Sequence, residues 1–257
     1  MDLPTIQTTM GRIAYSQKEI KGTIPIVFLH GVYYDHNLWN YQISRIENHS
    51  TIAIDMPLHG QSKSISKTDW NMDDCAHMLM EILDSLAVER CYAMGHSWGS
   101  MTILRAASQH PERFVGVGLC NMPMEGGSLR TKLQFGLQHT MLPFRNFYIQ
   151  QVAKAMFGKD NRLQKPEIVE YLAWSMGLLS NREIKKTDKE VISNVDSGYS
   201  YLDKLRVTAL AMKGRDDYVA TLDKIETTIV EGKHTSPLEE PEKVWALITT
   251  LIRQTKE

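Results

Sequence analysis

Two patterns of apolar residues divide most of the chain into short segments. Short runs of consecutive apolar residues, closed by glycine, proline or polar residues, predict buried parallel strands. Segments whose apolar residues recur every three or four positions predict helices that bury one face. Strands are expected at 24–29, 51–56, 90–94, 115–120, 207–212 and 227–230, and helices at 38–46, 71–86, 98–109 and from 241 onwards. Because strand and helix alternate, we predict an α/β fold with a mostly parallel sheet and helices on both faces.

The helix expected to begin near Asn71 has the clearest periodicity. Asp73 and Asp74 fall in its first turn, where carboxylates interact favourably with the positive end of the helix dipole. Its apolar positions form one face, made of Met72, Cys75, Ala76, Leu79, Ile82, Leu83 and Leu86. Charge and periodicity therefore place the start of this helix at the same point.

Two stretches depart from the alternation. Residues 8–16, which contain Gly11, predict an antiparallel hairpin at the edge of the sheet. Residues 122–205 are rich in methionine and aromatic residues and predict helices inserted between two strands. We interpret them as a helical lid rather than as more core, so residues 1–121 and 206–257 would form the α/β core and residues 122–205 the lid.

The composition is that of a globular protein that binds neither nucleic acid nor a membrane interior. The chain has 29 lysines and arginines and 30 acidic residues, so its net charge is -1. It therefore lacks the excess of basic residues that is typical of proteins that bind nucleic acid. No apolar run reaches the roughly 20 residues of a membrane span, and the first residues lack a signal-peptide pattern. The three cysteines are odd in number and have no C-x-x-C spacing, which favours buried thiols in a reducing cytoplasm. The oligomeric state has no signature in the sequence.

A G-x-S-x-G motif, Gly95-His96-Ser97-Trp98-Gly99, lies where a predicted strand ends and a predicted helix begins. In this setting a serine is held on a tight turn, and the flanking glycines avoid collisions of side chains with neighbouring backbone. The amino terminus of the helix directs backbone N–H groups at a developing oxyanion. Ser97 is therefore the predicted nucleophile.

A serine nucleophile needs a base, and nine histidines are available. His234 follows the last predicted strand, on a loop that opens at the carboxyl edge of the sheet together with Ser97. Asp216 and Asp217 follow the preceding strand at the same edge, and either one suits the role of orienting acid. The order nucleophile, acid, base along the chain is one of the known orders of catalytic triads. His30, His36, His59 and His96 also lie on loops at this edge, and His30 is expected to shape its loop.

In these features the sequence resembles the α/β-hydrolase superfamily over nearly the whole chain outside the lid. The matching blocks are His30-Gly31 with Trp39, Asp55-Met-Pro-Leu-His-Gly-Gln-Ser62, the motif around Ser97, His110-Pro111-Glu112-Arg113, Gly214 with Asp217, and His234 with Leu238-Glu-Glu-Pro241. His59 stands where the family usually has glycine. The G-x-x-D spacing of the resemblance favours Asp217 over Asp216 as the acid.

The resemblance implies a serine hydrolase that cleaves a carboxylic ester, or a thioester, lactone or carbon–carbon bond next to a carbonyl, of a small, partly apolar molecule. Ser97 would attack, His234 and Asp217 would complete the triad, and the backbone N–H groups of Val32 and Trp98 would bind the oxyanion. No metal ion or organic cofactor is called for. Contacts with substrate are expected from the oxyanion loop and the lid, specifically from His30, Tyr33, Met122, Met124, Phe144 and Trp174.

Two alternatives stay open at this point. Trp98-Gly99-Ser100 resembles proline iminopeptidases, but residues 30–34 do not match their H-G-G-P-G loop and the lid has no evident acidic set for a substrate amine. A ligand-binding protein on the same fold would have little turnover, but it would not require a complete triad. Subfamilies with an aspartate nucleophile, such as epoxide hydrolases, are excluded if Ser97 occupies the elbow. A perhydrolase or acyltransferase would share every residue named here.

Overall fold

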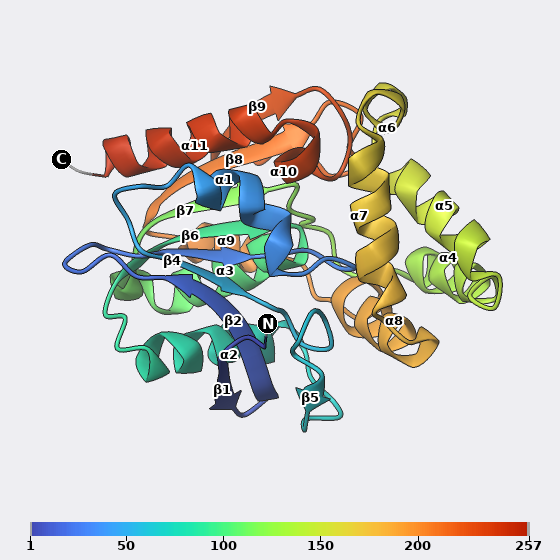
Figure 1. Cartoon of the computed structure of the whole chain (residues 1–257), viewed down its shortest axis with the longest axis horizontal. Coiled ribbons are helices and arrows are strands. Elements are labelled where there is room, and N and C mark those ends of the chain that lie inside the picture. Colours follow the sequence, from blue (N-terminus) through green and yellow to red (C-terminus); the bar gives the residue numbers. More distant parts are fainter. Residues whose placement is uncertain (1, 256–257) are drawn as a thin grey trace.

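The computed structural model describes residues 2–255, which contain one nine-stranded sheet flanked by helices (Figure 1). The strand order is β1-β2-β4-β3-β6-β7-β8-β9, and β5 pairs with β2 away from this path. The strands are β1 (Thr5–Thr8), β2 (Gly11–Lys18), β3 (Ile26–Leu29), β4 (Thr51–Ile54), β5 (Ser64–Ile65), β6 (Cys91–His96), β7 (Phe114–Cys120), β8 (Thr208–Gly214) and β9 (Glu226–Val230).

All pairings from β4 to β9 are parallel, whereas β1, β2 and β5 pair antiparallel. The carboxyl ends of the six parallel strands therefore meet at one edge of the sheet. This arrangement confirms the predicted fold class. The hairpin of β1 and β2 lies at the end of the strand order opposite to β9, as predicted for the edge of the sheet. At its turn Gly11 takes a φ of 131°, in the left-handed region that favours glycine.

Helices cover both faces of the sheet (Figure 1). One face carries α2 (Met72–Ser85), α3 (Trp98–Gln109) and α9 (Tyr199–Lys204), and the other carries α1 (Asn40–Ser44), α10 (Ser236–Glu239) and α11 (Pro241–Gln254). The helix expected at 38–46 is shorter and starts as a 3-10 turn, His36–Trp39, because Asp35 caps that turn through its side chain. A second short 3-10 turn, Pro111–Arg113, leads from α3 into β7.

The start of α2 lies where charge and periodicity predict it. The Asn71 side chain accepts hydrogen bonds from the backbone N–H groups of Asp73 and Asp74, and the Asp74 carboxylate accepts one from the Asn71 N–H. This reciprocal capping box satisfies N–H groups that the first turn of a helix otherwise leaves without partners. The apolar face of the helix, from Met72 to Leu83, is buried.

The chain between β7 and β8 forms a separate group of helices at the carboxyl edge of the sheet (Figure 1). They are α4 (Leu129–His139), α5 (Arg145–Met156), α6 (Lys159–Gln164), α7 (Pro166–Gly177) and α8 (Asn181–Asp188), followed by a π-helical turn, Lys189–Ser193. The last helix of this stretch, α9, packs against α3 of the core instead. No helix within residues 2–255 is both long and apolar enough to cross a membrane.

Candidate functional site

Ser97 occupies a strained turn between β6 and α3. Its φ of 50° and ψ of -110° lie in a region that non-glycine residues rarely adopt, and such a conformation costs on the order of 1–3 kcal/mol. The turn is held from two sides: the Ser97 N–H donates to the Cys120 carbonyl at 2.9 Å, and the Gly99 N–H donates to the His30 carbonyl at 3.1 Å. Neighbouring strands thus fix the predicted nucleophile at the carboxyl edge.

The two flanking glycines are required by close backbone contacts. A Cβ atom at Gly95 would lie 2.4 Å from the backbone nitrogen of Ser100, and one at Gly99 would lie 2.2 Å from the carbonyl oxygen of Leu29. Both distances are well inside van der Waals contact. Ser100, which stands where related motifs often have a third glycine, donates its hydroxyl to the Cys120 carbonyl at 3.0 Å.

His234 lies beside Ser97 although 137 positions separate them in the sequence. Its Nε2 is 2.9 Å from the Ser97 Oγ, and its Nδ1 is 2.9 Å from the Asp217 Oδ1. The backbone of His234 is fixed as well, because its N–H donates to the Met156 carbonyl at 3.0 Å and its carbonyl accepts from His96 Nε2 at 2.6 Å. The imidazole is therefore held between the serine hydroxyl and a carboxylate.

The carboxylate that contacts His234 belongs to Asp217, not to Asp216. Asp217 is buried, whereas Asp216 is exposed. Burial by itself raises the pKa of Asp217, but hydrogen bonds from His234 and Asn121 outweigh it and bring the pKa below its usual range. An ionised Asp217 accepts the Nδ1–H, which leaves Nε2 free to accept the serine proton.

Asn121 is part of the site, and sequence reasoning assigned it no role. It follows β7 and has a φ of 51°. Its amide donates to the Asp217 Oδ2 at 2.7 Å and to the Lys233 carbonyl at 3.0 Å, and its Oδ1 accepts from the Ser236 N–H at 3.1 Å. The side chain thus joins the loop of the acid to the loop of the histidine. The signal in the sequence was an amide at the end of a strand next to β8.

The loop after β3 packs directly against the serine turn. A Cβ atom at Gly31 would lie 2.5 Å from the Nδ1 of the buried His96 ring and 3.1 Å from the Ser97 Cβ, so glycine lets the loop come this close. The next residue, Val32, is buried, as is Trp98 on the other side of the serine. Across residues 2–255, neither the Val32 N–H nor the Trp98 N–H has a hydrogen-bond acceptor. These are the two N–H groups predicted to form the oxyanion hole.

Tyr33, the residue after Val32, is fixed at three atoms. Its N–H donates to His59 Nε2 at 3.1 Å, its carbonyl accepts from the Ser175 hydroxyl at 2.7 Å, and its own hydroxyl donates to the Asp188 carboxylate at 2.7 Å. Its φ of 72° is left-handed, which a bulky residue adopts only when its surroundings enforce it. Tyr33 therefore holds the Val32 segment in place, and its side chain is buried.

The other residues predicted to contact substrate fall into three groups. Both ring nitrogens of His30 are used within the fold, by the Gly31 carbonyl at 2.7 Å and the Met56 N–H at 2.9 Å. Met122 and Met124 are buried after β7. Phe144 and Trp174 are exposed, by 70% and 52%. The structure therefore leaves His30 no ring nitrogen for a substrate.

Tyr218 is a second residue that sequence reasoning missed. Its ring stacks on His234, with centroids 4.6 Å apart and planes inclined by 25°, and its hydroxyl lies 3.2 Å from His234 Nε2. Despite these contacts the side chain is 73% exposed. The hint in the sequence was an aromatic residue directly after the acid.

One cluster in the described part of the chain has spacing suited to a cation: Asp35, His36 and Asp55. The Asp55 carboxylate accepts from the His36 N–H, the His36 Nδ1 and the Gln61 N–H. Asp35 accepts from Asn37 and from the Tyr171 hydroxyl. These bonds shape the loops after β3 and β4.

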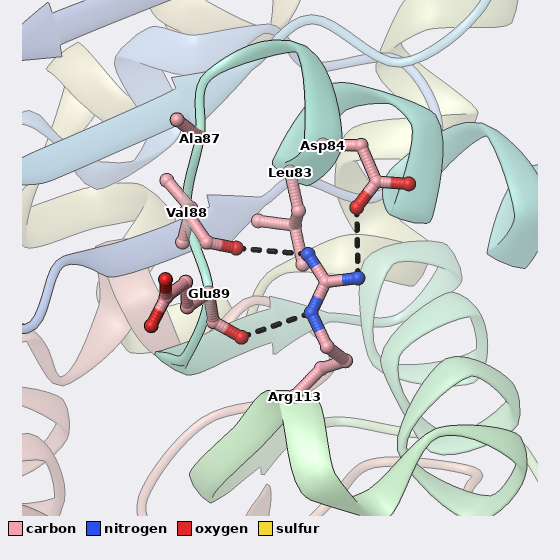
Figure 2. A pocket seen from close by; sticks show the side chains of 6 residues that line it. All are labelled: Leu83, Asp84, Ala87, Val88, Glu89 and Arg113. Carbon is pink, nitrogen blue, oxygen red and sulfur yellow. Dashed lines mark hydrogen bonds and ion pairs between the residues drawn. The ribbon is translucent and has the colours of Figure 1, made fainter.

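A groove lies at the opposite edge of the sheet, near the amino ends of β6 and β7 and the end of α2 (Figure 2). Arg113 points into it and donates to the Glu89 carbonyl at 2.9 Å and the Val88 carbonyl at 2.8 Å, and it pairs with Asp84 at 2.8 Å. Because these interactions occupy the guanidinium, the residue closes the turn after α2 and is not available to a ligand. The groove is separate from Ser97, which lies at the carboxyl end of β6.

Comparisons with known proteins agree with this fold. The family model of the alpha/beta hydrolase fold matches residues 24–158, more than half of the chain, so the chain belongs to this family. The Escherichia coli O1:K1 / APEC enzyme 2-succinyl-6-hydroxy-2,4-cyclohexadiene-1-carboxylate synthase is 32% identical over 102 residues, which are 40% of this chain and 38% of that protein. The chain thus matches less than half the length of the curated relatives: 32% of a non-heme haloperoxidase from Mycobacterium phage D29 and 38% of the Escherichia coli enzyme.

Two solved structures resemble the whole chain. A thermophilic esterase from Thermogutta terrifontis superposes with a TM-score of 0.85 at 18% identity, covering 99% of both chains. The enol-lactonase from Burkholderia xenovorans LB400 has a TM-score of 0.84 at 15% identity, covering 97% of this chain and 100% of that one. At these identities the likeness establishes the fold.

Proposed function

We propose that this protein is a serine hydrolase that cleaves a carboxylic ester or lactone through an acyl-enzyme. The observation that carries the proposal is the unbroken series of contacts from Ser97 through His234 to Asp217, with both distances 2.9 Å, at the carboxyl edge of the sheet. The strained backbone of Ser97 supports it, because such strain gathers at functional sites. The esterase and the enol-lactonase of the same fold give the reaction class precedent.

In the proposed acylation, Ser97 Oγ attacks the carbonyl carbon while His234 Nε2 takes its proton. Asp217 holds the imidazole by its Nδ1–H and stabilises the imidazolium that forms. The N–H groups of Val32 and Trp98 bind the oxyanion, each contributing roughly 3 kcal/mol if they act as other oxyanion donors do. The carbon–oxygen bond then breaks, and Nε2–H protonates the departing alkoxide. Water, activated by the same histidine, releases the acid in the second half-reaction.

The lid proposal, with residues 122–205 inserted into the core, is supported by the contacts of α7 and α8 with the loop after β3. Tyr171 donates to Asp35 at 2.6 Å, and Ser175 and Asp188 hold Tyr33. These helices thus lie against the segment that carries the predicted oxyanion donor. We propose that they form one wall of the substrate site.

Cleavage of a carbon–carbon bond next to a carbonyl is a second candidate. The name of the Escherichia coli relative, which is 32% identical over 102 residues, describes a synthase and not a hydrolase. The leaving group of that reaction is carbon instead of oxygen. Turnover of simple oxygen esters therefore favours the first candidate.

The test is turnover of p-nitrophenyl esters from acetate to dodecanoate, with labelling by a fluorophosphonate. Ser97→Ala should lose turnover by on the order of 10⁶-fold, and it should not be labelled. Ser108→Ala is the matched control, because Ser108 lies on the same helix and its hydroxyl bonds only the Arg105 carbonyl. Turnover or labelling that survives in Ser97→Ala would refute the mechanism. A wild-type protein without turnover or labelling would favour a ligand-binding protein.

The cytoplasm is the proposed compartment, supported by the buried free thiols of Cys75, Cys91 and Cys120.

A further inference from the structure

Tyr218 contacts the atom through which every proton of the proposed reaction passes. Its hydroxyl lies 3.2 Å from His234 Nε2, while Ser97 Oγ lies 2.9 Å from the same nitrogen. The tyrosine ring also stacks on the imidazole, with ring centroids 4.6 Å apart and planes inclined by 25°. Two hydroxyl groups thus meet at one nitrogen, one of them buried and the other on an exposed side chain.

The backbone around Tyr218 is firmly held, so the position of the ring follows from its loop. The Asp217 N–H donates to the Gly214 carbonyl at 3.2 Å, and the Val219 N–H donates to the Asp217 carboxylate at 3.4 Å. The ammonium group of Lys213 donates to the carbonyl of Asp217 at 3.4 Å and also to that of Val219. Residues on both sides of the tyrosine are therefore anchored to β8 and to the triad.

An exposed ring on the catalytic histidine marks the side from which a substrate reaches the triad. During acylation the oxygen of the leaving group must come within hydrogen-bond reach of Nε2, because Nε2–H delivers its proton. An oxygen in that position also lies close to the Tyr218 hydroxyl, since that hydroxyl is 3.2 Å from the same nitrogen. The phenol can then donate to the oxygen as negative charge builds on it.

We propose that Tyr218 is a further catalytic residue, whose hydroxyl stabilises the departing alkoxide oxygen; this rests on the proposed function. In the step, the electron pair of the breaking carbon–oxygen bond goes to the leaving oxygen, which takes the proton from His234 Nε2. Tyr218 donates a hydrogen bond throughout and keeps its own proton. In deacylation the attacking water takes the place of the leaving group and meets the same hydroxyl.

This role specifies the substrate class. An aliphatic alkoxide is a poor leaving group and gains most from a second donor, whereas p-nitrophenolate and thiolates depart readily without one. Tyr218 therefore points to oxygen esters or lactones of aliphatic alcohols, rather than to thioesters or activated aryl esters. A lactone fits the same geometry because its leaving oxygen is an alkoxide.

The test compares Tyr218→Phe with wild type on ethyl and p-nitrophenyl esters of one acid. The phenylalanine keeps the ring against His234 and removes only the hydroxyl. We expect kcat/KM for the ethyl ester to fall by about tenfold, as for the loss of one hydrogen bond, and kcat/KM for the p-nitrophenyl ester to change by less than about twofold. Tyr199→Phe is the matched control, because that hydroxyl donates to Glu125 and not to the triad; it should leave both values unchanged.

The leaving-group dependence separates this role from a structural one. An equal fall for both esters in Tyr218→Phe would mean that the hydroxyl only positions His234, and it would overturn the proposal. An unchanged kcat/KM for the ethyl ester would overturn it as well. In both cases wild-type turnover and fluorophosphonate labelling of Ser97 would still support the serine hydrolase. Their absence from the wild-type protein would overturn both proposals together.

Discussion

Acid should destabilise this protein at a pH where its carboxylates are still ionised, because three buried histidines are held neutral. Burial lowers the pKa of His30 to about 3, that of His59 to about 4 and that of His96 to about 3, from the usual 6.5. Two of them use both ring nitrogens: His30 and His59 each face a carbonyl with Nδ1 and accept a backbone N–H with Nε2. Protonation would destroy that acceptor.

The sign and size of the effect follow from linkage. Between pH 6.5 and the lowered pKa values, the unfolded chain binds protons at these histidines and the folded chain does not, so stability falls as pH falls. At pH 5, about 1.5 pH units below the unfolded pKa, each histidine costs about 2 kcal/mol relative to its contribution above pH 7.5. The three together cost about 6 kcal/mol, a large share of the 5–15 kcal/mol typical of a domain.

His36 acts in the opposite direction. Burial alone lowers its pKa, but the hydrogen bond and charge of Asp55 outweigh burial and raise it. The folded protein therefore binds this proton more firmly than the unfolded chain does, and the pair gains stability as pH falls through the raised pKa. One partly buried pair offsets only part of the cost of three fully buried rings.

The assay is urea unfolding followed by circular dichroism at pH values from about 7.5 to 5. His59→Gln supplies the matched variant, because glutamine can still donate and accept at this position but does not titrate. Its loss of unfolding free energy between pH 7.5 and 5 should be smaller than that of wild type by about 2 kcal/mol. A wild-type stability that is flat over this range would show that the histidines are solvated or already charged, and would refute the reasoning.

Two further predictions concern the acid and its support. Asp217→Asn should lower kcat by about 10⁴-fold while the fold is kept, because the wrong tautomer is held, whereas Asp216→Asn should match wild type in the same p-nitrophenyl ester assay. Equal losses in the two variants would contradict the assignment of the acid. Asn121→Gly, which tolerates the φ of 51°, should lose about 2–4 kcal/mol in urea unfolding, since the Ser236 N–H loses its acceptor and the Asp217 carboxylate loses one of its donors. An unfolding free energy equal to that of wild type would contradict this.

The fold was predictable because its signals are local. The periodicity of α2 and α3 and the apolar runs of β3, β4 and β7 each lie within a few residues, and the structure places these elements within two residues of the expected bounds. The positions of Ser97 and His234 at strand ends were predictable for a related reason, since parallel strands bring their carboxyl ends to one edge.

The contacts between loops were not predictable, because nothing local encodes them. Asn121 meets Asp217 across 96 positions, and Tyr33 meets Asp188 across 155. The apolar residues of the inserted helices were equally ambiguous, since an aromatic type does not reveal which side of a short helix is buried. Phe144 and Trp174 are examples. Their residue types suggested contacts with substrate, but both side chains are exposed.

His59 also explains why the loop after β4 departs from the motif that the family usually has there. His59 stands where the family usually has glycine, and its Nε2 accepts the N–H of Tyr33. Tyr33 in turn follows Val32 and is held by Asp188 from α8. A chain of buried bonds therefore links the loop after β4, the predicted oxyanion loop and the inserted helices. His59 must stay neutral to accept the N–H of Tyr33. Protonation of His59 would therefore both disturb the geometry of the site and lower the stability of the fold in acid.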